Sequence, residues 1–214
     1  MANYHPSDDL LMQFAAGQAP NALGIIVACH IETCGSCAAK VRRYESLGGD
    51  ILSSLEPEPV GANVLDNILA RLDDPVANDK PLNSANQQVE IPPPLRRFVD
   101  KDFDQLSWSG FSSSIKEFVL PISDERYTAK FYRIAAGKEL PEHTHEGNEF
   151  TLVMRGSFCD KAGDYHKDDF ILADTQTVHQ PRAHMEEDCI CFAVMDAPLK
   201  MTGFFGRMLN PFLR

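Results

Sequence analysis

Two groups of histidine, cysteine and glutamate have the residue types and spacings that bind metal ions. The first group consists of His5 and the pattern H-x-x-x-C-x-x-C, formed by His30, Cys34 and Cys37. Residues three or four apart share one face of a helix, so the side chains of this pattern can meet around a helix junction. Two thiolates and two imidazoles form the closed tetrahedral shell of a structural zinc site. We expect His5 as the fourth ligand because it is the only other histidine in the N-terminal half.

Two other interpretations of Cys34 and Cys37 are open. They could be small buried thiols with His5 on the surface, but the complete pattern arises by chance far less often than a lone CxxC. They could also cycle between thiols and a disulfide, but no thioredoxin-like strand and helix precede them. Zinc ligation is therefore the favoured prediction.

The second group lies in the C-terminal half and follows one extended pattern. It reads Gly137-x5-His143-x-His145-x3-Glu149-x6-Gly156, with His179 thirty residues after Glu149. Side chains two apart on a strand point to the same face, so His143 and His145 can bind one ion, and Glu149 can approach after a turn. Three imidazoles and one carboxylate suit Zn, Fe, Mn or Ni. The alternative, scattered polar residues of a His-rich surface loop, does not account for so complete a spacing.

The residues that must position the first group show helical periodicity. Ser7, followed by two aspartates, predicts a capped helix start, and Gly17 predicts the helix end. From Asn21 to Ile31 the segment is apolar on nearly every side, which a helix tolerates only if it is buried all round. This second helix therefore needs a cover.

Two further helices are predicted. One begins near Ser36 and runs to Leu47, where Gly48-Gly49 interrupts it. The other carries an amphipathic stripe made up of Val64, Leu65, Ile68, Leu69 and Leu72. This stripe and the apolar second helix offer more hydrophobic surface than a bundle of about 75 residues can readily hide. We therefore expect a partner to bind Leu65, Ile68, Leu69 and Leu72, the alternative being that these residues pack against the other helices.

Between residues 73 and 94 the periodicity stops. The segment has no aromatic residue, is rich in Asp, Asn, Gln and Pro, and ends in three prolines, which is typical of a linker. Beyond it the hydrophobic period becomes two, in 127–132, 150–154 and 189–194, and Gly, Asp and Pro turns separate the predicted short strands. We predict three regions, which are a helical domain at 1–75, a linker at 76–94 and an antiparallel barrel or sandwich at 95–214.

Charge and composition disfavour several classes of protein. There are 20 Lys and Arg against 31 Asp and Glu, the net charge is −11, and both halves are acidic. Direct binding to nucleic acid is not expected, because it needs cationic side chains that replace phosphate counterions. The sequence shows neither a signal-peptide pattern nor an apolar run of about 20 residues, so we expect a cytoplasmic protein without a membrane span. A reducing compartment favours metal ligation over disulfides.

Cys189 and Cys191 form a third candidate group. They flank Ile190 in a predicted strand, so both thiols face the same way, ten and twelve residues after His179. A thiol near a metal can acquire thiolate character and be oxidised first, which would make this pair a redox sensor. The alternative is that both are apolar filler in the core. A disulfide between them is not expected, because positions i and i+2 of one strand are poorly placed for one.

The clusters resemble those of two known families. The pattern from Gly137 to Gly156 resembles the first motif of the cupin superfamily, which implies a cupin β-barrel with a metal bound by His143, His145, Glu149 and His179. The second cupin motif matches less well, because its turn positions hold Asp168, Asp174 and Gln176. The N-terminal cluster resembles the zinc-binding anti-sigma domain. The two halves in this order resemble the ChrR-type zinc anti-sigma factors over essentially the whole chain.

The resemblance implies an α+β multidomain protein, with a small N-terminal zinc-binding helical bundle and a C-terminal cupin antiparallel β-barrel. It implies that the bundle binds and inhibits an extracytoplasmic-function sigma factor. The cupin domain, with zinc or another divalent transition metal, would govern release in response to oxidative stress, with singlet oxygen or related oxidants as the stimulus. Such a protein is not an enzyme.

The alternative is a metal-dependent cupin enzyme, a dioxygenase or an isomerase, whose helical region is a structural zinc domain. The cupin motif does not separate the two functions, because this fold hosts both enzymes and sensors. A purely catalytic cupin has no evident need for the cluster of His5, His30, Cys34 and Cys37. The N-terminal cluster therefore favours the regulator.

Overall fold

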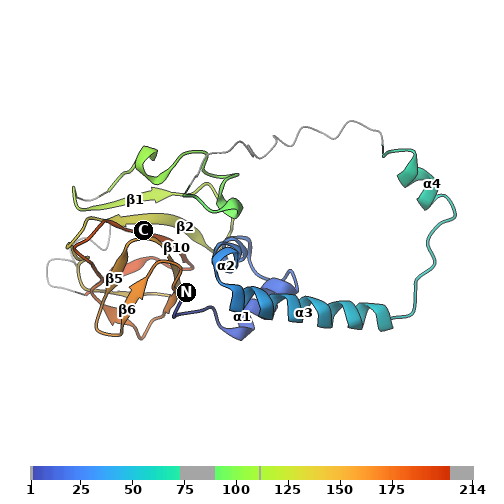
Figure 1. Ribbon diagram of the computed structural model, residues 1–214, viewed down its shortest axis with the longest axis horizontal. Coiled ribbons are helices and arrows are strands. Elements are labelled where there is room, and N and C mark those ends of the chain that lie inside the picture. Colours follow the sequence, from blue (N-terminus) through green and yellow to red (C-terminus); the bar gives the residue numbers. More distant parts are fainter. Residues whose placement is uncertain (1, 73–89, 111, 203–214) are drawn as a thin grey trace.

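The computed structural model describes residues 2–72, 90–110 and 112–202, in which α-helices precede β-strands along the chain (Figure 1). Within these residues, four α-helices and two short 3-10 helices are followed by strands that form three antiparallel sheets. The predicted order of a helical region and then a domain of short antiparallel strands is confirmed.

Helix α1 (Asp8–Ala15) starts and ends where the sequence predicts. Ser7 Oγ accepts a hydrogen bond from the Leu10 amide (3.2 Å), which satisfies one of the free donors of the first turn. Gly17 follows the helix with a φ of 67°, a conformation that glycine adopts without strain. The buried side chains of this helix are Leu10 and Leu11, and the helix packs against α2 and α3.

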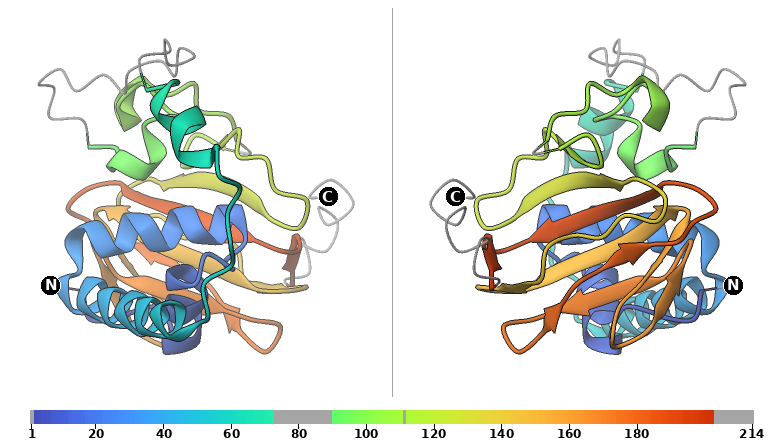
Figure 2. Two further views of the ribbon diagram at one scale, coloured as in Figure 1. Left: turned by 90° about the vertical axis from the view of Figure 1, so that its right-hand side faces the viewer. Right: turned by 90° about the vertical axis from the view of Figure 1, so that its left-hand side faces the viewer.

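Helix α2 (Asn21–Thr33) finds its cover in the strands that follow later in the chain. The helix is buried from Ala22 to His30 except for two small residues. It contacts the strands β4 (Glu149–Arg155) and β10 (Cys189–Met195) of the largest sheet as well as α1 and α3. Figure 2 shows it lying across this sheet. The predicted need for a cover is therefore met within the chain, because the sheet covers this helix. One continuous core joins the helices to the strands.

Helix α3 (Gly35–Ser54) is longer than predicted, because it runs through Gly48-Gly49. A glycine lowers helix stability by about 1 kcal/mol, and it commonly ends a helix by adopting a left-handed conformation. Neither glycine has a positive φ. The predicted helix end at Leu47 is therefore wrong. The buried residues of α3, Cys37 and Val41, lie in its first half.

Helix α4 (Val64–Leu69) forms at the predicted amphipathic stripe, although it is only six residues long. Its apolar residues Leu65, Ile68 and Leu69 and the following Leu72 are each more than half exposed. Figure 1 shows α4 standing apart from the sheets, beyond the far end of α3. The alternative in which this stripe packs against the other helices does not hold.

The largest sheet has five strands in the order β1-β2-β10-β4-β7. They are β1 (Ile115–Val119), β2 (Thr128–Ile134), β10 (Cys189–Met195), β4 (Glu149–Arg155) and β7 (Phe170–Ala173). The three segments with a predicted period of two are the three central strands. All seven side chains of β10 are buried, because Ile190, Phe192 and Val194 face the core shared with the helices, whereas Cys189 and Cys191 face a second core inside the barrel.

Two smaller sheets close the other side of this second core. One has the order β11-β3-β8 and the other β6-β5-β9. Their strands are β3 (His143–His145), β5 (Ser157–Cys159), β6 (Asp164–His166), β8 (Val178–His179), β9 (Arg182–Ala183) and β11 (Leu199–Met201). The core between the sheets contains Phe158, Tyr165 and Ala183 from the β6-β5-β9 sheet. The strands thus enclose an interior, as the predicted barrel requires.

The chain joins the shared core again near residue 91. Most of the predicted linker at 76–94 lies outside the described residues, but Ile91 is fully buried. The 3-10 helix η1 (Pro93–Leu95) contacts α2, and Leu95 is also fully buried. A second 3-10 helix, η2 (Phe103–Gln105), buries Phe103. Residues 91–103 are therefore part of the packing between the helices and the sheet.

No single helix in the described part of the chain is long and apolar enough to cross a membrane. Helices α2 and α3 meet the length and composition criteria only when taken together, and they bend by 119° at their junction. That junction is Cys34, which ends α2 and precedes α3.

Candidate metal centres

The N-terminal cluster forms where α2 meets α3. His30 lies in the last turn of α2, Cys34 is the extended residue between the two helices (φ −95°, ψ 93°), and Cys37 lies in the first turn of α3. His5 comes from the segment that precedes α1. One potential ligand atom of each residue lies within 4.8 Å of those of the other three. The structure thus brings together all four predicted ligands of the first site.

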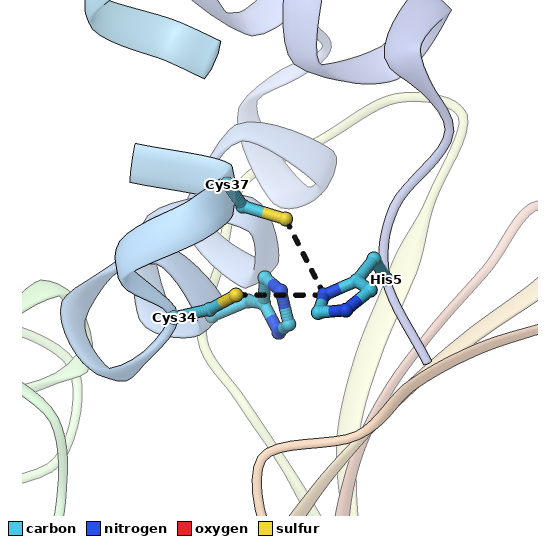
Figure 3. A group of neighbouring side chains, drawn as sticks. His5, Cys34 and Cys37 are labelled. Atoms are coloured by element: carbon cyan, nitrogen blue, oxygen red, sulfur yellow. Dashed lines mark hydrogen bonds between the residues drawn. The ribbon is translucent and has the colours of Figure 1, made fainter. Parts of the chain in front are cut away.

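Distances in this cluster match those of a tetrahedral site. His5 Nδ1 lies 3.4 Å from Cys34 Sγ and 3.5 Å from Cys37 Sγ (Figure 3). Nitrogen and sulfur ligands held tetrahedrally at zinc bond lengths lie about 3.5 Å apart. The cluster therefore fits a zinc-sized ion without rearrangement of these three side chains.

His30 has one imidazole nitrogen without a partner. Its side chain is fully buried, and Nδ1 lies 3.0 Å from the backbone oxygen of Asp168. A carbonyl oxygen only accepts, so Nδ1 carries the proton and Nε2 keeps a free lone pair. Among the described residues nothing donates a hydrogen bond to Nε2. A buried lone pair without a donor is costly in a protein but is the normal state of a metal ligand.

The two thiols of the cluster differ in how readily they ionise. Burial opposes ionisation of Cys34, but the Ser36 hydroxyl, 3.1 Å from Sγ, and nearby backbone groups outweigh burial and lower its pKa. Burial and the neighbouring Cys34 raise the pKa of Cys37 to about 11. Two adjacent thiolates repel each other unless a cation lies between them. The pair therefore fits a metal ion, which would ionise both sulfurs.

The second cluster forms between β3 and β8. His143 and His145 lie on the same face of β3, and both are buried. His179 on β8 lies opposite His143 in the antiparallel pair. His179 Nε2 is 3.0 Å from His143 Nε2 and 3.1 Å from His145 Nε2. The sheet register thus gathers three of the four predicted ligands within 4.8 Å of one another.

The Nε2 atoms of His143 and His179 face each other, whereas each Nδ1 has a hydrogen-bond partner outside the cluster. His143 Nδ1 donates to the Pro141 carbonyl (2.8 Å), and His179 Nδ1 donates to the Asp160 carboxylate (3.0 Å). In neutral rings with this arrangement each Nε2 is an acceptor, and a cation bound between the two Nε2 atoms would satisfy both. Burial lowers the pKa of His143 and of His145 to about 4. Neutral rings that are oriented by a second hydrogen bond are the usual ligands of transition metals.

Glu149, the fourth predicted ligand, lies beside the histidines but outside their group. Its Oε1 accepts from the Thr151 hydroxyl (3.0 Å), and its Oε2 is 3.9 Å from His145 Nδ1. This Oε2 is buried and has no hydrogen-bond partner among the described residues. Burial raises the pKa of Glu149 to about 7. Glu149 starts β4 in the main sheet, whereas the histidines come from the facing sheet, which explains the separation.

A small cavity adjoins the second cluster. Glu149, His143 and His179 line it together with Asp160, Cys191 and several apolar side chains. Its volume of about 40 Å³ is enough for water. Pockets for substrates of ordinary size occupy about 300 Å³ or more. The cavity is therefore too small for such a substrate in this conformation.

Cys189 and Cys191 lie side by side on β10 and face the barrel interior together, as predicted. Both are buried, and their sulfurs are 3.6 Å apart. The contact with Cys189 and burial raise the pKa of Cys191, so the Cys191 thiol is protonated in the reduced protein. Cys191 lines the same cavity as Glu149 and His179. An oxidant that enters this cavity would meet one thiol of the pair.

Three supporting residues are missing from the sequence prediction. Asp160 orients His179, the Asp168 carbonyl orients His30, and the Asp169 carboxylate accepts from the amides of Asn3 and Tyr4. Asp160 and Asp168 lie in turns, where aspartates are common because their side chains hydrogen-bond nearby backbone amides. The one signal available in the sequence was Asp168, which occupies a turn position of the second cupin motif. In the structure its φ is 76°.

The chain is similar to known proteins over nearly its whole length. Residues 98–197 match the family described as the ChrR cupin-like domain. Over 211 residues the chain is 31% identical to the anti-sigma-E factor ChrR of Cereibacter sphaeroides. This alignment covers 99% of this chain and 98% of that protein. It is also similar to the crystal structure of Rhodobacter sphaeroides SigE in complex with the anti-sigma ChrR. That match has a TM-score of 0.80 and 30% identity, and it covers 92% of this chain and 100% of the matched chain.

Proposed function

The chain belongs to the ChrR family of anti-sigma factors, and we propose that it binds an extracytoplasmic-function sigma factor and keeps it from RNA polymerase. Its family makes it a regulator rather than an enzyme, and the small cavity of the cupin domain agrees with that role. Inhibition of a sigma factor takes place in the cytoplasm. We assign binding to the helical domain at 1–75 and regulation to the cupin domain at 95–214.

The proposed docking surface is an arm formed by the second half of α3 and by α4. Large apolar side chains on this arm are each more than half exposed, namely Leu47, Ile51, Leu52, Leu55, Leu65, Ile68, Leu69 and Leu72. Figure 1 shows α3 extending away from the sheets and α4 lying beyond its end. Exposed apolar rows of this kind mark protein-binding surfaces, because an amphipathic helix buries such a row in a partner. This arm is the observation that carries the proposal.

We infer that His5, His30, Cys34 and Cys37 bind a structural zinc ion. Four protein ligands leave no open position, so the ion would stabilise the fold and not react. Cys34 and Cys37 lie at the bend between α2 and α3, and α2 is fixed on the sheet. The centre therefore sets the direction in which α3 leaves the body of the protein, and with it the position of the docking arm.

We infer that His143, His145 and His179, with Glu149 as the fourth ligand, bind zinc or another divalent transition metal. When bound, such an ion supplies a Lewis-acid or redox-active centre at the wall of the cavity. Pro141 and Asp160 hold the rings of His143 and His179 in the required orientation. The unpaired Oε2 of Glu149 is available at the edge of the cluster.

The cupin domain is proposed to release the sigma factor under oxidative stress, with singlet oxygen or related oxidants as the stimulus by family resemblance. Cys189 and Cys191 are the proposed redox-sensing residues. Support for this role is the place of Cys191 in the wall of the cavity beside Glu149. Replacement of both cysteines by serine is expected to abolish the response in a reporter assay, and an unchanged response would exclude them as sensors.

Affinity capture of the full chain from the cytosol of its host tests the proposed function. Mass spectrometry is expected to identify a sigma factor with the wild type, and much less of it with the Leu65→Ala/Leu69→Ala variant. Leu172→Ala is the matched control, because Leu172 is equally exposed but lies on β7 of the main sheet. Equal recovery with both variants would contradict the proposed docking arm, and recovery of no sigma factor with the wild type would contradict the function.

A further inference from the structure

The segment that precedes His5 is held by a turn of the cupin domain. The amides of Asn3 and Tyr4 donate to one carboxylate oxygen of Asp169 (2.5 and 3.1 Å), and the Tyr4 carbonyl accepts from the Phe170 amide (3.0 Å). Asp169 is fully buried at the turn between β6 and β7. Figure 1 shows the N-terminus beside β6. These hydrogen bonds fix the residue before His5 on the cupin domain.

The Tyr4 side chain lies on a second turn, between β5 and β6. Its ring centroid is 4.8 Å from that of Tyr165 on β6. The turn approaches the Tyr4 hydroxyl so closely that a Cβ added to Gly163 would lie 2.7 Å from it. A ring packed against this turn must follow any movement of the turn.

Asp160 holds this second turn and the cupin cluster at the same time. Its Oδ1 accepts from the amides of Ala162 and Gly163 (2.8 and 3.1 Å), and its Oδ2 accepts from His179 Nδ1 (3.0 Å). The Asp160 side chain is only 4% exposed, so water does not readily replace these bonds. The orientation of His179 and the shape of the turn therefore depend on one carboxylate.

We propose that Tyr4 is a positioning residue that couples the cupin cluster to the N-terminal metal centre. The contacts are consecutive, from His179 to Asp160, from the turn of Asp160 to the Tyr4 ring, and across one peptide bond to His5. An ion in the cupin cluster fixes His179 and thereby Asp160. Loss of the ion frees the turn, and His5 is then held less firmly beside its partner sulfurs. This inference rests on the proposed function, because it gives the regulatory domain a route to the centre that directs the docking arm.

Loss of cobalt(II) from the full chain tests the coupling. Absorption from cobalt–thiolate bonds reports the N-terminal centre, and the cupin cluster of histidines and a carboxylate gives no such band. After addition of a chelator, Tyr4→Ala is expected to lose the band about tenfold faster than the wild type. Tyr4→Phe keeps the ring and is expected to restore the wild-type rate. His179→Ala alone is expected to speed loss of the cobalt–thiolate band. In a chain that already carries Tyr4→Ala, it is expected to cause no further increase in this rate, because both changes act through the same contacts.

Two further variants keep this test decisive. Tyr127→Ala is the matched control, because Tyr127 packs against the shared core instead of the turn between β5 and β6. This variant is expected to lose cobalt at the wild-type rate. Gly163→Ala keeps Tyr4, but its Cβ would force the Tyr4 side chain away from the turn. It therefore replaces Tyr4→Ala, with the same expected faster loss of the band, if circular dichroism shows that Tyr4→Ala does not fold.

The outcomes separate the coupling from the proposed function. Equal rates for Tyr4→Ala and the wild type, or effects of Tyr4→Ala and His179→Ala that multiply, would overturn the coupling and leave the proposed function intact. A wild-type chain without any cobalt–thiolate band would overturn the proposed metal centre, and the coupling with it.

Discussion

The two candidate metal centres differ in where their supporting contacts come from. The cupin histidines are oriented by Pro141 and Asp160, which belong to the same domain. In the N-terminal centre, His30 is oriented by the Asp168 carbonyl, and the segment before His5 is held by Asp169. Both aspartates lie in one turn of the cupin domain. The centre that directs the docking arm is therefore completed by the domain that is proposed to regulate it.

Their ligands differ as well. The N-terminal centre combines two sulfurs with two nitrogens, which makes a closed shell. The cupin cluster has three nitrogens and an adjacent carboxylate, and it lies at the wall of a cavity that can hold water. On the basis of this contrast we propose a structural role for the first centre and a responsive role for the second.

Among the changes that test this contrast, removal of both sulfurs of the N-terminal centre is expected to have the largest effect. Cys34→Ser/Cys37→Ser is predicted to lose the N-terminal ion and to weaken sigma-factor binding by about 100-fold or more, because ion binding supplies folding free energy to this junction. Elemental analysis and a binding titration measure the two quantities. Cys29→Ala is the control, since Cys29 is also buried on α2 but is not in the cluster. An unchanged metal content in the double variant would show that the sulfurs are not ligands.

A smaller core side chain in α2 tests whether the helical region depends on the cupin sheet. Ile26 is fully buried in the shared core, so Ile26→Ala is expected to lower the free energy of unfolding by about 3 kcal/mol. The midpoint of urea unfolding is expected to shift equally whether it is measured by helical circular dichroism or by the fluorescence of Trp108. Leu69→Ala on the exposed α4 is expected to cost less than about 0.5 kcal/mol. Two separate transitions would mean that the regions are stabilised independently.

Loss of the Asp160 carboxylate is expected to weaken the cupin centre. Asp160→Ala is predicted to lower its metal affinity by about 10-fold to 100-fold, because the His179 ring loses its orienting partner. Competition with a chelator measures this affinity. Asp164→Ala is the matched control, because Asp164 lies on β6 nearby but contacts His184 instead of a ligand. Equal metal affinities for the two variants would show that Asp160 does not support the cupin site.

The smallest effect is expected at the start of α2. Asp124 of the cupin domain accepts from the Ala22 amide (3.0 Å) and thus caps a helix of the other region, so Asp124→Ala is expected to cost about 1 kcal/mol of unfolding free energy. Glu125→Ala, an exposed neighbour, is the control. A cost no larger than that of the control would show that the cap contributes nothing.

The same cap predicts a dependence on pH. Partial burial raises the pKa of Asp124, but the bonds from Ala22 and from the amides of Arg126 and Tyr127 outweigh burial and lower it. A folded-state pKa below that of the unfolded chain means that the contribution is complete above the unfolded pKa and is lost as pH falls through the folded pKa. Unfolding curves of wild type and Asp124→Ala are therefore expected to converge at acidic pH.

Local patterns account for what the sequence could predict. Three of the four N-terminal ligands lie within eight residues of chain, and His143 and His145 share one short strand. Helical spacing and period two therefore indicated both clusters and the three central strands of the main sheet. The helix end at Leu47 failed because a glycine pair is a local weakness that neighbouring turns can tolerate.

Contacts between distant parts of the chain account for what the sequence could not predict. His30 and Asp168 are separated by 138 residues, and Asn3 and Asp169 by 166. No spacing rule relates such pairs, and aspartates in turns have ordinary local roles. The sequence predicted that α2 must be buried. It did not predict that the main sheet buries it, because this depends on how the whole sheet is placed.

The place of β10 in the main sheet has a consequence for biosynthesis. This strand lies in the middle of the sheet and covers α2, yet it is residues 189–195 of the chain. At typical elongation rates of 5–20 residues per second, roughly ten to thirty seconds separate the emergence of α2 from the ribosome and that of β10. During this interval the apolar surface of α2 has no sheet to cover it, and for most of it His30 lacks its Asp168 partner. The packing of α2 and the orientation of His30 are therefore completed only after translation has passed β10.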